Sequence, residues 1–192
     1  MLYSGQMNKT SSKAALAAAI LTATLALTGC AATSAPSSDP SSSHMSNGDE
    51  KLTEKAGFAM MMIPHHLQAI KMSAYAKENA KDPQVLELAK QIYTAQAAEI
   101  ATMQGWLGDV EVPEHTMSEG MLTDEQMTAL AEAKGADFDA LFLEGMTAHH
   151  KGALTMATDF QNTDDPELKT LVTQILQVQT IELSMMKLLA AK

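Results

Sequence analysis

The sequence contains no arginine, a single cysteine and few aromatic residues, which make up 4% of its 192 residues. All 13 basic residues are lysines, and the net charge is −10. The chain lacks the guanidinium groups that favour phosphate, and its charge repels polyanions, so we expect no nucleic-acid partner. One cysteine, Cys30, allows neither an intramolecular disulfide nor a thiolate metal cluster. Methionine, in contrast, is abundant, with 15 residues.

The N-terminal segment has the pattern of a bacterial lipoprotein signal. Lys9 and Lys13 precede an uncharged run rich in alanine and leucine, which ends in Leu-Thr-Gly before Cys30. The run is short for a membrane span, and small residues before a lone cysteine are typical of a lipobox. We therefore expect residues 1–29 to be removed and Cys30 to carry a lipid that anchors an exported protein to the bacterial envelope, on its periplasmic or outer surface.

The rest of the chain divides into a tether and one domain with an internal repeat. Residues 30–52, rich in serine and proline, are expected to form a flexible tether. Within residues 53–192, one pattern occurs twice with an offset of 84 and another with an offset of 83, which indicates a duplicated unit. The matched residues are Phe58, Met62, His65, His66, Ala69 and Met72 with Phe142, Met146, His149, His150, Ala153 and Met156, then Leu88, Ile92, Gln96, Glu99 and Met103 with Leu171, Ile175, Gln179, Glu182 and Met186.

Each unit is predicted to form a helical hairpin. Apolar residues recur at spacings of three and four, and Asp82-Pro83 and Asp165-Pro166 supply an N-cap followed by proline at the first helical position. Two antiparallel hairpins then pack as an all-α, four-helix up-and-down bundle. We expect the first hairpin over residues 53–108, the second over 137–192, and between them a connection over 109–136 with a short helix that starts at a Thr123-x-x-Gln126 capping box.

Two further details of the helices are predicted. Pro64 fits a kink or break just before the first histidine pair, because proline lacks a backbone N–H. In the second unit, Asp137 is expected to open a helix that ends at about Asn162.

Polar residues share the face of these helices that turns to the core. At 100° per residue, the histidines and methionines from Met62 to Met72 lie within an arc of about 120°, and those from Met146 to Met156 follow the same pattern. On the second helices, Glu99 and Glu182 occupy positions where an apolar residue is expected. A buried carboxylate without a partner is costly, so each must meet a cation, a metal or strong donors, and the repeat offers the histidines as partners.

The predicted core therefore contains four histidines, at least four methionines, two glutamates and two glutamines. Thioethers select Cu(I), while imidazoles suit Cu(I), Cu(II) and Zn, so this mixture favours copper. Glutamate and glutamine on the facing helices can accept the second imidazole N–H. Outside the helices, His44-Met45, His115-x-Met117 and Met121 repeat the pairing of the two residue types. The alternative is structural, since methionine fills irregular gaps and adjacent histidines can form a hydrogen-bonded core pair.

At these residues the sequence resembles the ferritin-like domain-of-unknown-function family numbered 305. The hallmark of that family is a Met-x-x-His-His-x-x-Ala helix, then Asp-Pro and a Gln-x-x-Glu-Ile helix with a methionine, and it matches here over residues 54–190. The second copy departs from it at Thr147-Ala148 and at Leu183. The resemblance implies a ferritin-like bundle and a copper role outside the cytoplasm. The implied ligands are Met62, His65, His66, Met72, Met146, His149, His150 and Met156, with Gln96, Glu99, Met103, Gln179, Glu182 and Met186 as residues that support or extend the site.

Three functions remain open. The first is an exported, membrane-anchored lipoprotein without enzymatic activity that sequesters copper, Cu(I) in preference to Cu(II), or delivers it to a copper-transfer protein. The second is a ferritin-like oxidoreductase with a di-iron or mixed centre, and the third is an envelope scaffold whose His/Glu network only specifies packing. Carboxylate di-iron bundles need Glu-x-x-His on two helices, and neither Glu99 nor Glu182 has a histidine three residues later, which favours the first function. Whether the domain forms a homo-oligomer stays open.

Overall fold

The computed structural model describes residues 53–112 and 118–192. The predicted all-α class is confirmed, because this part of the chain forms five helices and no strand. The predicted signal (1–29), the tether (30–52) with Cys30 and His44-Met45, and His115-x-Met117 lie outside the described residues. The helices are α1 (Glu54–Asn79), α2 (Pro83–Leu107), α3 (Asp124–Glu132), α4 (Gly135–Thr158) and α5 (Pro166–Ala190).

Capping side chains start four of the five helices. The side chains of Thr53, Asp82 and Asp165 accept hydrogen bonds from backbone N–H groups in the first turns of α1, α2 and α5. Thr123 and Gln126 form the reciprocal capping box that the sequence predicts for α3. These bonds satisfy N–H groups that have no partner within the helix, so the helix starts are set by local sequence.

Of the kink or break predicted at Pro64, the break is wrong, because α1 continues through this residue to Asn79. Proline removes one hydrogen bond from a helix, but Pro64 is buried in a helix that packs against both α2 and α4. Tertiary packing therefore maintains the helix across a local breaker.

The predicted bounds of α4 are also shifted. The helix begins at Gly135, whose φ of +64° turns the chain into it, rather than at Asp137. It ends at Thr158 rather than at about Asn162, because the next residues form tight turns in which backbone N–H groups bond three residues back.

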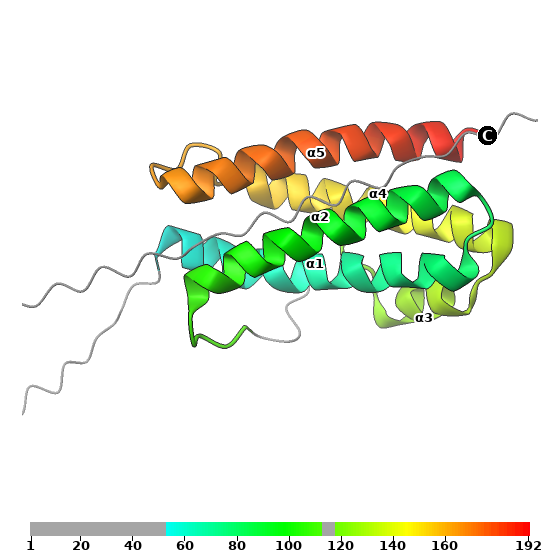
Figure 1. Cartoon of the computed structure of the whole chain (residues 1–192), viewed down its shortest axis with the longest axis horizontal. Helices are drawn as coiled ribbons and strands as arrows, with labels where there is room; N and C mark the ends of the chain where they lie inside the picture. Colours follow the sequence, from blue (N-terminus) through cyan, green and yellow to red (C-terminus); the bar gives the residue numbers. More distant parts are fainter. Residues whose placement is uncertain (1–52, 113–117) are drawn as a thin grey trace, which may run out of the picture. The chain divides into compact units, whose positions relative to one another are not determined.

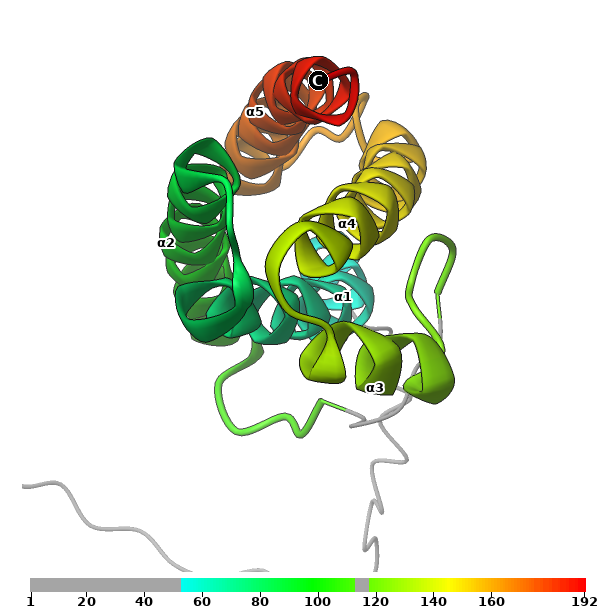
Figure 2. The same ribbon diagram turned by 90° about the vertical axis from the view of Figure 1, so that its right-hand side faces the viewer.

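The four long helices pack around a core that consists of two hydrophobic clusters. Figures 1 and 2 show α1 beside α2, α4 beside α5, and α3 on the outside. The main contacts between the hairpins are those of α1 with α4, supplemented by α2 with α5, and α3 packs against α1 and α4. The first helix of each unit therefore lies at the interface between the units, and these are the helices that carry the histidine pairs.

Polar contacts tie the two hairpins together at both ends. At one end, Asp139 of α4 accepts hydrogen bonds from the backbone N–H groups of Lys81 and Asp82, over 3.1 and 2.8 Å. At the other end, Lys55 of α1 pairs with Glu167 over 2.5 Å. The first contact joins α4 to the turn after α1 and the second joins α1 to the first turn of α5, so the two hairpins are linked at both ends.

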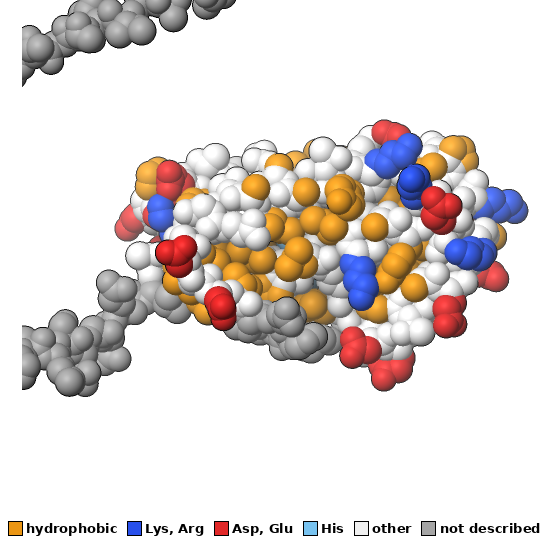
Figure 3. Space-filling view, turned by 60° about the horizontal axis from the view of Figure 1, so that its bottom comes forward, with side chains coloured by type: hydrophobic (Ala, Val, Ile, Leu, Met, Phe, Trp, Pro, Cys, Tyr) orange, Lys and Arg blue, Asp and Glu red, His pale blue; other side chains and the backbone are white. Residues whose placement is uncertain are grey.

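The surface of the described domain combines apolar and charged areas. Figure 3 shows apolar side chains along the middle of one face and charged side chains mostly toward its ends. None of the described helices has the length and apolar character needed to cross a membrane.

Replacing Phe58 with alanine should lower the free energy of unfolding by about 3–5 kcal/mol, because its ring is fully buried and its removal leaves a cavity. Leu188, which is 71% exposed, provides the control, and Leu188→Ala should change stability by less than about 0.5 kcal/mol. Urea denaturation of the metal-free protein measures both. Equal losses in the two variants would contradict the assigned core.

Candidate metal site

All four histidines are buried in the core, and two of them, His65 and His149, meet where α1 packs against α4. His65, His66, His149 and His150 are all 0% exposed. The ring centroids of His65 and His149 lie 3.7 Å apart, whereas the adjacent rings within each pair are 6.4 Å apart. One histidine of each unit therefore contacts the other unit, and the second histidine of each pair points elsewhere.

That second histidine meets a buried glutamate of its own hairpin. His66 Nε2 lies 2.8 Å from a carboxylate oxygen of Glu99, and His150 Nε2 lies 2.7 Å from one of Glu182. A carboxylate oxygen accepts hydrogen bonds, so Nε2 is the donor in each pair. The two glutamates that interrupt the apolar seams of α2 and α5 thus have histidine partners.

The central histidines donate to backbone carbonyl groups. His149 Nε2 lies 2.8 Å from the carbonyl oxygen of His65, and His65 Nε2 lies 3.2 Å from that of Glu119. A carbonyl oxygen accepts only, so these two rings also carry their proton on Nε2. All four imidazoles are therefore held with the proton on the same nitrogen.

The other ring nitrogen, Nδ1, has no hydrogen-bond partner in any of the four histidines, and all four Nδ1 atoms are buried. A ring with its proton on Nε2 has a lone pair on Nδ1, which is the form that binds metal ions. A buried polar atom without a partner is costly, and a metal ion would satisfy these four. The imidazoles therefore fit metal ligands whose outer hydrogen bonds are already made.

Burial keeps the central rings neutral. Burial, together with a smaller contribution from the neighbouring His66, lowers the pKa of His65 to about 3. Burial also lowers the pKa of His149 well below its usual value, and the rings of His65, His150 and His66 add to this shift. Two neutral imidazoles in contact avoid charge repulsion and keep their lone pairs available to a metal.

The methionines form two matched groups in the core. In the first hydrophobic cluster, Met72, Met146 and Met186 are fully buried. In the second, Met62 and Met103 are fully buried, and the half-buried Met156 packs against that cluster. Each group takes one thioether from α1, one from α4 and one from α2 or α5. By the repeat, each residue of one group corresponds to a residue of the other.

The structure does not gather all the predicted ligands around one ion. In residues 53–112 and 118–192, no three His, Cys, Asp or Glu side chains lie close enough to share a metal. The amides of Gln96 and Gln179 are buried, but they bond neither to the histidines nor to any other group. The donors are instead divided between the two hairpins, which each carry one His/Glu pair, and the two hydrophobic clusters, which each contain one methionine group.

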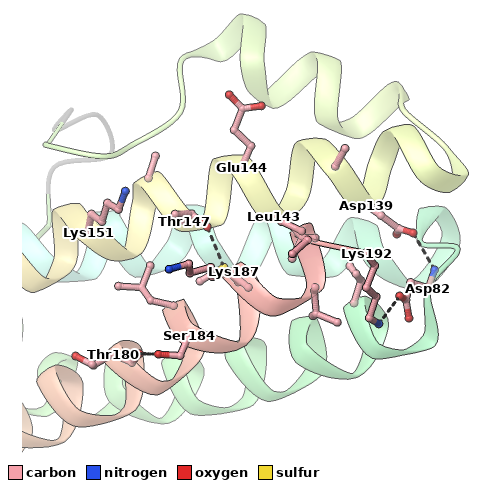
Figure 4. Close-up of a pocket in the computed structure, with 18 of the residues that line it drawn as sticks. Asp82, Asp139, Leu143, Glu144, Thr147, Lys151, Thr180, Ser184, Lys187 and Lys192 are labelled. Carbon is pink, nitrogen blue, oxygen red and sulfur yellow. Dashed lines mark hydrogen bonds and ion pairs between the residues drawn. The ribbon is translucent and has the colours of Figure 1, made fainter.

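A groove of about 1120 Å³ lies between α4 and α5 (Figure 4). Its lining includes Met186, whose sulfur accepts a hydrogen bond from Thr147 Oγ1 over 3.6 Å. None of the four described core histidines belongs to this lining. The groove approaches one methionine group from the α5 side without reaching the rings.

Two residues near the histidines are not distinguished by the sequence patterns above. Gln68 of α1 bonds through its side chain to both backbone groups of Leu122, and Gly152 of α4 has the backbone of Glu119 directly against it. They occupy equivalent positions in the repeat, one turn or less from the histidine pairs. The signal that could have found them is this departure from the repeat, since a glutamine in one copy matches a glycine in the other.

The described domain is a helical protein with buried imidazole and thioether donors, a class suited to soft metal ions. The chain belongs to the family described as domain of unknown function (DUF305), whose model matches residues 55–190. Comparison with curated proteins gave no match.

Three solved structures illustrate the likeness. A DUF305 protein from Streptomyces coelicolor, whose description proposes secretion, is 30% identical with a TM-score of 0.63, over 69% of this chain and 88% of that one. CopM in its Cu(II)-bound form is 32% identical with a TM-score of 0.61, over 71% and 95% of the two chains. CopM in its Cu(I)-bound form is 34% identical with a TM-score of 0.60, over 69% and 92%. CopM also has an Ag-bound form.

The metal-free protein should lose stability when the pH falls below the usual histidine range. Because the pKa of His65 is lowered to about 3 and that of His149 is also lowered, the unfolded chain binds protons that the folded protein does not. The free energy of unfolding should therefore decrease as the pH falls from about 6.5, by up to about 1.4 kcal/mol per pH unit for each ring. Urea denaturation with a chelator at about pH 7 and about pH 5.5 measures this. Equal stability at both values would contradict two neutral, buried rings.

Proposed function

We propose that this protein is an exported copper-binding protein without enzymatic activity that sequesters Cu(I) or passes it on. The observation that carries the proposal is the set of four buried Nδ1 atoms without hydrogen-bond partners, in a core that also contains two methionine groups. Neutral imidazole and thioether are the ligands that Cu(I) prefers, and hard cations gain little from them. Copper is here the cargo of the protein.

Each half of the core holds one copper ion in this proposal. One half combines the His66–Glu99 pair with the group of Met62, Met103 and Met156, and the other combines the His150–Glu182 pair with the group of Met72, Met146 and Met186. The glutamates hold the rings through Nε2 and raise the basicity of Nδ1, while His65 and His149 contribute the remaining nitrogen atoms between the halves. Gln96 and Gln179 extend the polar surroundings of the two ions.

The copper-bound and silver-bound forms of CopM support this choice of metal, since this chain is 32–34% identical to CopM over most of its folded domain. Silver and Cu(I) share a preference for soft donors. Binding of Cu(II) is compatible with the imidazoles, and we propose that the thioethers shift the balance toward Cu(I).

The architecture and the location belong to the same proposal. We infer that the four long helices form a ferritin-like up-and-down bundle, because the two hairpins pack side by side around a polar centre. The lipid on Cys30 and the tether over residues 30–52 would hold this domain at the envelope, where a copper-transfer protein could reach it.

A carboxylate di-iron centre is less compatible with the core. In the described residues, Glu99 and Glu182 are the only buried carboxylates, and each is bonded to a histidine. Di-iron bundles place several carboxylates directly on the metal ions. The donor set therefore favours copper binding over oxidase chemistry.

The metal-free protein should bind Cu(I) much more tightly than Zn(II) or Fe(II). Replacing both central histidines, His65→Ala with His149→Ala, should weaken Cu(I) binding by more than about 100-fold, because the loss of ligands costs more than the loss of their supporting hydrogen bonds. Competition titration with a Cu(I) chelator measures the affinity. Met61 lies beside Met62 but is 37% exposed, so Met61→Leu is the control and should bind like the parent. A double variant that titrates like the parent would eliminate the proposed site.

Replacing Glu99 with leucine should weaken Cu(I) binding by about 10–100-fold, because His66 loses the acceptor that sets its ring and its tautomer. The variant should still fold, since leucine suits the apolar seam of α2. Chelator competition and circular dichroism measure the two effects. A folded variant with unaltered affinity would remove Glu99 from the metal site.

A further inference from the structure

One segment of the connection is fastened across α1 and α4. This segment, residues 118–122, is called the strap below. At its end, Gln68 of α1 donates through Nε2 to the carbonyl oxygen of Leu122 over 2.9 Å, and the N–H of Leu122 donates to Gln68 Oε1 over 2.7 Å. One side chain thus satisfies both backbone groups of a strap residue, which fixes that residue relative to α1.

Glycines bring the strap into backbone contact with α4. A Cβ on Gly152 would lie 1.8 Å from the carbonyl oxygen of Glu119, and one on Gly120 would lie 2.4 Å from that of Ala148. Gly120 also has a φ of +82°, which other residues rarely adopt. The strap can lie against α4 only because both positions lack a side chain.

The strap covers His65. The carbonyl oxygen of Glu119 accepts the hydrogen bond of His65 Nε2 at 3.2 Å, while Glu119 itself is exposed to solvent. At this point the strap is therefore the segment of the described chain that separates the fully buried imidazole of His65 from water. The same contact gives the ring its acceptor, so the strap both orients His65 and shields it.

Only one half of the repeat has such a cover among the described residues. Gln68, which bonds to the strap, and Gly152, against which the strap lies, occupy equivalent positions in the two copies of the repeat. The two copies therefore differ at this position, and each residue serves a different contact with the strap. His149, the counterpart of His65, donates instead to the carbonyl oxygen of His65 and has a protein helix over it. The strap thus breaks the symmetry of the histidine centre.

We propose that the strap is the gate through which a metal ion exchanges with the histidine centre, with Gln68 as the positioning residue that holds it on His65. The gating role rests on the proposed function, whereas the positioning role does not. When the Gln68 clamp opens, His65 loses its acceptor and becomes the first ring that water, a metal ion or a competing ligand can reach. The ion then exchanges from the α1–α4 side and not through the groove between α4 and α5.

Gly152→Ala tests the proposal with the smallest change. The added methyl group would clash with the backbone of Glu119, so the strap could no longer lie against α4 at this position. It touches no proposed ligand. Gly105→Ala is the matched control, because Gly105 is also helical and a Cβ there meets nothing within 4 Å. Gln68→Leu, which removes the clamp without adding bulk at Gly152, serves as the second variant, and circular dichroism with urea denaturation checks that each full-length variant folds.

The first measurement uses the metal-free protein. Long-range proton–nitrogen spectra of the histidine rings should show four Nε2–H tautomers in the parent and in Gly105→Ala. In Gly152→Ala and Gln68→Leu, the His65 resonances alone should lose the fixed tautomer and gain rapid exchange with water, while those of His66 and His150 stay unchanged. A fixed and protected His65 ring in both folded variants would overturn the positioning role.

The second measurement follows the transfer of Cu(I) from the loaded protein to a chelator. Transfer should be about tenfold or more faster in Gly152→Ala and Gln68→Leu than in the parent and Gly105→Ala, as expected from the loss of one or two hydrogen bonds over the exchange route. Unchanged rates with a released His65 ring would overturn the gate and leave the positioning role. A parent that binds no Cu(I) would overturn the proposed function and the gate, and the ring spectra would still decide the role of Gln68.

Discussion

Four imidazole rings lie in an apolar core, where a polar nitrogen without a partner is costly, and this constraint organises the domain. The protein satisfies one nitrogen of each ring and leaves the other free, using Glu99, Glu182 and two backbone carbonyl groups as acceptors. The glutamates must therefore sit inside the seams of α2 and α5, and the helices must keep a fixed register. The requirement for hydrogen-bond partners thus links helix packing directly to the chemistry of the free nitrogen atoms.

The duplicated hairpin gives the centre its near symmetry. The two His/Glu distances, 2.8 and 2.7 Å, and the two methionine groups match across the α1–α4 interface. The match ends at Met156, which is half-buried while its counterpart Met72 is fully buried, and at the strap, which accepts the hydrogen bond of His65 but not that of His149. The two copies of the repeat keep the same donor residues but differ in the segments that cover them. They can therefore provide two sites of the same chemistry that differ in how easily solvent or a metal ion reaches them.

Much of this arrangement follows from the sequence. The capping residues and helical periodicity predict the starts of α1, α2, α3 and α5, and the repeat predicts which histidines, methionines and glutamates face the core. The sequence alone could not show that α1 continues through Pro64, because packing against two neighbouring helices overrides the local preference of proline. The strap was not predictable either, since it depends on contacts between a loop, Gln68 and Gly152 that are distant in sequence. Periodicity reports faces of helices, whereas loop contacts arise only from the assembled fold.

Because Met156 is partly exposed, the two methionine groups differ in their resistance to oxidation. A thioether that water can reach is open to oxidation to the sulfoxide, which replaces a soft sulfur donor with a polar group. Met72, at the equivalent position, is shielded by the core. In an oxidising compartment, the group of Met62, Met103 and Met156 would be oxidised before the other methionine group, which would keep its three thioethers for longer.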